Sequence, residues 1–160
     1  MATSTNGTIT FSYTTNALFN DVELISAFMT KDLVDSNGSA TDKFIITEDE
    51  AELLDLCVKQ IVPKIFEYML NISKCATGYS YENGNIAFSV KNNNAYNENV
   101  LPLVDSTIYD CLKYGVLSEF YSICTQVSLY SIVKAKYDEM LHLLDQRLYQ
   151  LKKRSISSLY

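Results

Sequence analysis

Residues 78–90, GYSYENGNIAFSV, constrain the fold more than any other part of the sequence. Asn83 and Gly84 both tolerate the positive φ that a two-residue type I′ turn requires, and apolar residues alternate with polar ones on either side. With Glu82 opposite Asn85, the hairpin gathers four apolar side chains on one face: Tyr79, Tyr81, Ile86 and Phe88. A ribbon of two strands is only marginally stable in water. The hairpin must therefore lie on helices, pair with another strand of the chain, or pair with a neighbouring subunit.

A second short strand is predicted near the N-terminus, at about 8–13. Thr8-Ile9-Thr10-Phe11-Ser12-Tyr13 alternates polar and apolar residues with the two-residue period of a half-buried strand. Ile9, Phe11 and Tyr13 share its apolar face. Residues 1–7 before it are expected to form a flexible arm.

Two helices are predicted before the hairpin. The first, at about 17–30, has Leu18, Val22, Ile25 and Met29 at spacings of three and four. The second begins with a capping box, Thr47 with Glu50 three residues later, and its apolar stripe runs to about residue 73. Pro63 lies inside that stripe, so we expect a bend or break near residues 59–63.

Two more helices are predicted after the hairpin. The third starts from Asn99 as N-cap, with Pro102 tolerated in its first turn. Residues of low helix propensity between Ser122 and Ser128 predict a corner. The last helix has apolar residues at spacings of three and four, namely Val133, Tyr137, Met140, Leu141, Leu144, Leu148 and Leu151.

These elements predict a mainly α fold: a single helical domain over 1–160, with a bundle of about four helices, a β-hairpin at about 79–90 and the short strand at 8–13. A composition of 48% hydrophobic and 20% charged residues is that of a globular chain. The apolar runs are far shorter than the roughly 20 residues of a membrane span, and MATSTNGTITF lacks the pattern of a secretory signal. We therefore expect that the protein is made in the cytoplasm and does not associate with a membrane.

Charge is distributed unevenly along the chain, whose formal net charge is −6. Residues 131–160 hold six Lys or Arg against three Asp or Glu, whereas residues 1–130 hold seven against sixteen. Lys152, Lys153 and Arg154 end the last helix, where they also complement the helix dipole. The extended tail after them, residues 155–160, carries Ile156, Leu159 and Tyr160. An acidic body with a basic, then apolar, end indicates an interaction surface.

Residues that could support catalysis or metal binding are few. The four cysteines form no Cys-x-x-Cys pair, so we expect reduced structural thiols and no zinc site. The turn DSNGSATD at 35–42 lacks the glycine position and final glutamate of an EF-hand. His142 is the single histidine, four residues after Asp138, and is expected to face solvent. The sequence thus predicts no enzyme and no cofactor.

The order of these parts resembles the head-to-tail connector, or adaptor, proteins of tailed bacteriophages. The resemblance covers roughly residues 18–154 and is carried by TEDEAELLDLCVKQI, the hairpin, VLPLVDSTIYDCLKYGVLSEFY and SLYSIVKAKYDEMLHLLDQRLYQLKKR. It is a likeness of layout, without a diagnostic motif. The N-terminal strand does not map onto the family.

The resemblance implies a structural protein of the virion neck, a homo-oligomeric ring of about twelve copies seated on the portal protein. It would contact other neck or tail proteins, and DNA would only pass through the lumen. The implied portal and ring interface is Lys152, Lys153, Arg154, Ile156, Leu159 and Tyr160. The implied inter-subunit strand and hairpin residues are Ile9, Phe11, Tyr13, Tyr79, Tyr81, Ile86 and Phe88.

Two other classes of function remain open from the sequence. One is a tail-completion factor or helical adaptor that binds a partner helix without enzymatic activity. The other is a small enzyme or ligand-binding domain with a polar pocket around His142 or Asp110. Deletion of residues 155–160 separates a connector from an adaptor with a self-contained binding surface.

Overall fold

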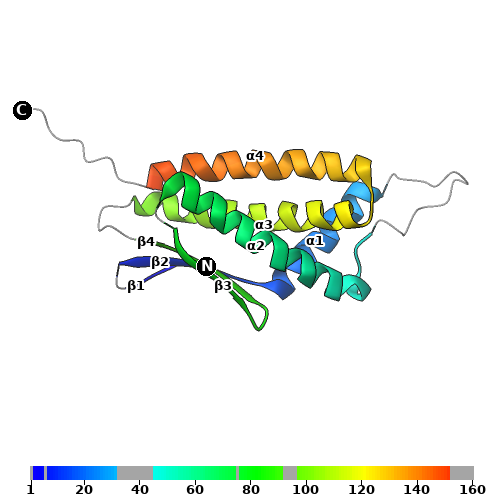
Figure 1. Cartoon of the computed structure of the whole chain (residues 1–160), viewed down its shortest axis with the longest axis horizontal. Helices are drawn as coiled ribbons and strands as arrows, with labels where there is room; N and C mark the ends of the chain where they lie inside the picture. The colour runs from blue at the N-terminus through cyan, green and yellow to red at the C-terminus, as the bar shows by residue number, and fades with distance from the viewer. Residues whose placement is uncertain (1, 6, 32–44, 75, 92–96, 152–160) are drawn as a thin grey trace, which may run out of the picture.

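Four helices lie on one side of a four-stranded antiparallel sheet in the computed structural model (Figure 1). The structure describes residues 2–5, 7–31, 45–74, 76–91 and 97–151. The strands are β1 (Ala2–Thr5), β2 (Thr8–Thr14), β3 (Ala76–Glu82) and β4 (Asn85–Lys91). The helices are α1 (Thr15–Thr30), α2 (Ala51–Ser73), α3 (Leu101–Ile123) and α4 (Val127–Leu151), with short 3-10 turns η2 (Glu48–Glu50) and η3 (Glu98–Val100) before α2 and α3. The predicted mainly α fold is confirmed.

The hairpin of β3 and β4 has the predicted register. Tyr81 pairs with Ile86 and Tyr79 with Phe88 across the turn, where Asn83 and Gly84 both have positive φ, 50° and 73°. Of the three partners that the sequence left open, the structure has two: β2 runs antiparallel to β4 with Phe11 opposite Phe88, and the apolar face of the hairpin lies on the helices. The hairpin therefore lies within a larger sheet.

The predicted flexible arm is wrong for Ala2–Thr5. These residues form β1, which pairs antiparallel with β2 and places Ala2 opposite Phe11. Gly7 has a φ of 79° in the connection. Asn6-Gly7 is the same dipeptide as Asn83-Gly84, so the sequence did hold a hairpin signal at this position.

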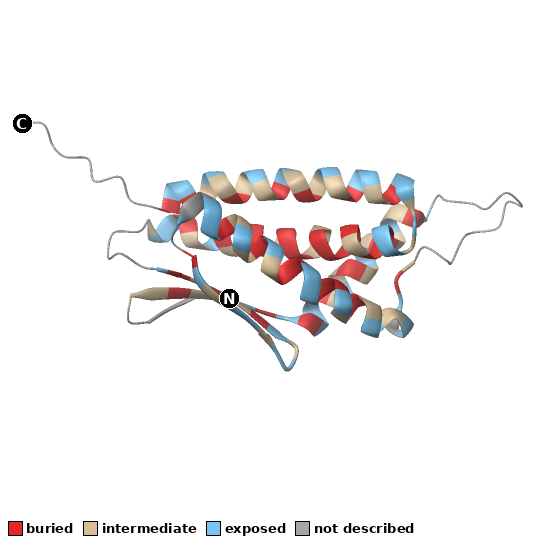
Figure 2. Cartoon of the chain, in the orientation of Figure 1, coloured by how far each residue is buried: buried red, intermediate tan, exposed pale blue. Residues whose placement is uncertain are grey.

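The sheet is apolar on the face toward the helices and polar on the other (Figure 2). Apolar residues of β2 and β4 point to the helices, and these are buried: Ile9, Phe11, Tyr13, Ile86, Phe88 and Val90. The opposite face presents mostly small polar side chains, among them Thr8, Thr10, Ser12, Thr14, Ser80 and Ser89. The core thus lies between sheet and helices, as the two-residue period predicts.

Helix α2 differs from its predicted start and does not break at its proline. Only half of the capping box forms. Glu50 Oε2 accepts from the Thr47 N–H at 2.8 Å, as a capping box requires. The Thr47 hydroxyl, which should accept from the Glu50 N–H, instead donates to the same Glu50 oxygen. The first turn is consequently the 3-10 turn η2. The helix continues through Pro63 to Ser73. The carbonyl four residues earlier, which loses its usual donor, belongs to Lys59, an exposed residue.

The predicted cap Asn99 lies inside the 3-10 turn η3 that leads into α3. Asn97 caps this turn, because its side-chain oxygen accepts from the Asn99 N–H at 3.2 Å, whereas the N-cap position of α3 itself is Val100 and makes no side-chain bond. The predicted corner is confirmed, since α3 ends at Ile123, α4 begins at Val127, and Thr125 has a φ of 56°. Helices α3 and α4 then pack side by side along their lengths (Figure 1).

Gly115 lies where α2, α3 and α4 cross. A Cβ at this position would lie 2.9 Å from Ile61 Cγ2 on α2 and 3.1 Å from Tyr137 Cε2 on α4. Both neighbours are buried. The absence of a side chain in the middle of α3 therefore allows the three helices to approach closely.

Candidate interaction surfaces

The residues predicted for an inter-subunit strand and hairpin lie mostly in the chain's own core. Five of them, Ile9, Phe11, Tyr13, Ile86 and Phe88, are at most 9% exposed. Their apolar face is covered by the chain's own helices, so these five side chains are not exposed for the inter-subunit contact that the resemblance implies. The predicted tail residues, Lys152, Lys153, Arg154, Ile156, Leu159 and Tyr160, lie outside the described residues.

Tyr79 and Tyr81 keep partial exposure because they belong to β3, an edge strand, and both contact α2. The Tyr79 ring lies 4.9 Å from the Phe66 ring. The Tyr81 hydroxyl donates to Asp55, whose other carboxylate oxygen lies 2.6 Å from Lys59 Nζ. The bonds from Lys59 and then from Tyr81 lower the pKa of Asp55, while burial and the Asp55 bond raise the pKa of Tyr81. These contacts fix β3 against the bundle.

Tyr13 attaches β2 to α3 in the same way. Its hydroxyl lies 2.9 Å from both the backbone oxygen and Oδ1 of Asp105, to which it donates. Its ring stacks on Tyr109 with centroids 5.5 Å apart. Burial, followed by the Asp105 charge, raises the pKa of the Tyr13 phenol. The residue is neutral and structural, because burial and the Asp105 carboxylate both favour the protonated phenol.

The sheet has an open strand at each side. In the order β1-β2-β4-β3, β1 and β3 each pair with a single strand of the described chain. An edge strand presents a row of backbone donors and acceptors that another strand could pair with. Since β1 and β3 are different strands at opposite sides of the sheet, any pairing between them in two copies would be head to tail.

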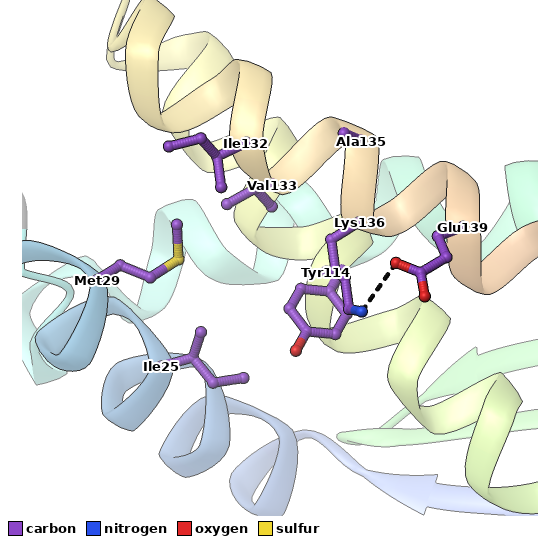
Figure 3. A pocket seen from close by; sticks show the side chains of 8 residues that line it. All are labelled: Ile25, Met29, Tyr114, Ile132, Val133, Ala135, Lys136 and Glu139. Carbon is purple, nitrogen blue, oxygen red and sulfur yellow. Dashed lines mark hydrogen bonds and ion pairs between the residues drawn. The ribbon is translucent and has the colours of Figure 1, made fainter.

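An apolar groove lies between α1 and α4, with α3 as its floor (Figure 3). It has a volume of about 380 Å³ and is lined by Ile25 and Met29 of α1, Tyr114 of α3, and Ile132, Val133, Ala135, Lys136 and Glu139 of α4. Ile132 is 60% exposed, and Ile25 and Met29 are partly buried. A large apolar side chain of α4 thus faces solvent beside the groove.

Charged side chains lie along one side of the groove, and they pair with one another. Lys136 Nζ lies 2.8 Å from Glu139 Oε2, and this hydrogen bond is the main cause of a raised Lys136 pKa (Figure 3). Asp110 also acts on Lys136 and lies 2.8 Å from Lys113. Neighbouring Tyr109 bonds to Asp21 of α1. The carboxylates of Asp21, Asp110 and Glu139 therefore outnumber the ammonium groups of Lys113 and Lys136. We call these five residues the acidic margin of the groove.

Sequence reasoning missed the groove. It predicted a first helix with Leu18, Val22, Ile25 and Met29 at spacings of three and four, without separating buried from exposed positions. Leu18 and Val22 are fully buried, but Ile25 and Met29 are only partly so and line the groove. A signal was present in the sequence: α1 has apolar residues at 24, 25, 28 and 29, which is a wider apolar arc than one packed face requires.

Cys57 and Cys111 are buried, whereas the single histidine lies at the surface. Burial raises the pKa of Cys57 to about 12 and raises that of Cys111 further, so both stay thiols. His142 is exposed, and its predicted neighbour Asp138 pairs with Lys134. Within the described ranges no three His, Cys, Asp or Glu side chains converge as a metal site would require, and no described helix is long and apolar enough to cross a membrane.

The comparisons with known proteins give no relative to which the chain can be aligned. No protein-family model, curated protein or solved structure matches it. The surfaces above are consequently interpreted from their own geometry.

Proposed function

We propose that the protein is a structural component of a tailed-bacteriophage neck that forms a ring between portal and tail. The observation that supports this proposal best is the pair of open edge strands, β1 and β3, at opposite sides of one sheet. Closed rings are built from heterologous contacts, in which one surface of a subunit fits a different surface of the next. Two distinct edges provide two such surfaces.

The charge distribution supports the same proposal. Residues 1–130 are strongly acidic, whereas the chain following α4 begins with Lys152, Lys153 and Arg154. In the proposed ring these three residues face an acidic portal surface. Ile156, Leu159 and Tyr160 then attach the tail to a companion protein. The apolar face of the sheet has no part in this assembly, because the chain's own helices cover it.

The test is reconstitution of the purified protein with portal rings. Native mass spectrometry and electron microscopy should show a ring of this protein on the portal. A variant lacking residues 155–160 should keep the circular dichroism spectrum of the full chain and lose portal docking. A protein that stays monomeric and ignores portal rings would refute the proposal.

A helical adaptor is the second candidate function, and the groove between α1 and α4 is the observation that favours it. Grooves between two helices accept the apolar face of a third. An adaptor of this kind would keep its binding after deletion of residues 155–160 and lose it on Ile132→Asp. The two variants therefore separate the two functions.

A further inference from the structure

We propose that the groove between α1 and α4 binds the tail, residues 155–160, of a second copy of this chain. This proposal rests on the proposed function in one respect: both treat the tail as an anchor. It adds the site that receives the tail, and it holds for the purified protein with no other component present.

The groove has the size and lining of a site for a few apolar side chains. Its volume of about 380 Å³ falls within the range of roughly 300–1,000 Å³ that protein pockets for small ligands occupy. Ile25, Met29 and Ile132 form its apolar walls, and the Tyr114 ring forms its floor (Figure 3). Filling it would remove the exposed surface of Ile132 from water, which is favourable.

The tail has the apolar spacing that such a groove accepts. Leu159 and Tyr160 follow Ile156 at the third and fourth positions, so all three would fall on one side of a single helical turn. The residues between them are serines. This is the pattern by which a helical segment places its apolar side in a groove between two helices.

A chain's own tail is too short to fill its own groove. Glu139, the groove residue nearest to the end of α4, lies about 18 Å along the helix from Leu151, and Ile132 lies about 28 Å away. Ile156, five residues past Leu151, reaches at most about 17 Å even when fully extended. In the helical turn proposed above, Leu159 and Tyr160 add at most about 6 Å to this reach, to roughly 23 Å in all. The chain's own tail therefore stops short of Ile132, and the three apolar residues fill the groove only if they come from another copy.

The charges beside the groove suit the basic residues that precede the tail. Asp21, Asp110 and Glu139 outnumber Lys113 and Lys136 at this margin. In Figure 1, α1 and α4 run in roughly opposite directions. The run from 152 to 154 carries three positive charges immediately before the tail. Apolar residues in the groove would bring this run to the acidic margin.

The resulting contact is head to tail. Each copy offers a groove on one stretch of α4 and a tail beyond its end, so one copy's tail occupies the next copy's groove. Repetition of such a contact gives a closed ring or an open filament.

Two complementary variants test this contact in the purified full-length chain. Leu159→Asp disables the tail and leaves the groove intact, whereas Ile132→Asp disables the groove and leaves the tail intact. Sizes are measured by light scattering after gel filtration and by native mass spectrometry, over a roughly hundredfold concentration range. Circular dichroism checks that each variant folds, with Ile132→Ser as a milder groove variant. Tyr149→Asp is the matched control, because this side chain is 58% exposed on α4 away from the groove.

The wild type and Tyr149→Asp should self-associate, and each of the two disabling variants alone should weaken self-association by at least about tenfold. Mixing Leu159→Asp with Ile132→Asp should give a 1:1 heterodimer, because one intact tail then meets one intact groove. Three results would overturn the proposal: a wild type that is monomeric throughout, a disabling variant that still assembles alone, or a mixture without heterodimer. Portal docking is absent from this experiment, so its outcome is separate from that of the proposed function.

Discussion

Replacing Gly115 by alanine should destabilise the protein, although the same change stabilises most helices. In an exposed helix interior, alanine is favoured over glycine by about 1 kcal/mol. At Gly115 the new Cβ would lie 2.9 Å from Ile61 Cγ2 and 3.1 Å from both Ile61 Cδ1 and Tyr137 Cε2. Ile61 is β-branched and fully buried, so its Cγ2 cannot turn away without a clash elsewhere.

The size of the effect follows from two opposing terms. Forcing a methyl group into a packed core costs about 1–3 kcal/mol. The higher helix propensity of alanine offsets about 1 kcal/mol of this cost. We expect a net loss of about 1 kcal/mol in the free energy of unfolding, which is a fall of about 2–4 °C in Tm for a chain of this length.

The assay is urea and thermal unfolding followed by circular dichroism. Gln146→Gly and Gln146→Ala, at an exposed position of α4, measure the propensity term in the same protein. Ile61→Ala should cost about 2–5 kcal/mol alone. In that background, Gly115→Ala should become neutral or stabilising, because the space it needs is now empty. A single Gly115→Ala variant that is more stable than the wild type, by as much as the Gln146 pair differs, would refute the close crossing of the three helices.

Two further predictions follow from the pKa shifts. Lys59 and Tyr81 lower the pKa of Asp55 in the folded state, so their stabilisation is present above the ordinary Asp pKa and disappears as the pH falls through the lowered one. Asp55→Asn should therefore be less stable than the wild type at pH 7, and in urea titrations this difference should shrink as the pH is lowered below the ordinary Asp pKa; a pH-independent difference would contradict this contribution. Cys57 is fully buried with a pKa of about 12, whereas Cys124 is only partly buried, so alkylation at pH 8 read by peptide mass mapping should label Cys124 well before Cys57. Equal labelling rates in the native protein would argue against the buried position of Cys57.

The sequence by itself determined the local elements and which of their faces are apolar. The β3–β4 register follows from Asn83 and Gly84, because few residues other than glycine and asparagine adopt positive φ at low cost. The corner before α4 and the buried stripe of that helix likewise follow from propensity and spacing. Such features depend on residues close together in the chain, so a single sequence specifies them.

Tertiary structure alone decided which apolar faces meet. The hairpin pattern was compatible with helices, with another strand or with a neighbouring subunit, and the tertiary structure supplies the first two: Phe11 of β2 pairs with Phe88, and the helices cover the apolar face. The same holds for Ile25, whose helical spacing resembles that of buried Val22 but which lines a groove, because α4 packs on α3 and leaves α1 partly uncovered. Periodicity states that a face is apolar, but whether another surface covers it depends on contacts between residues far apart in the sequence.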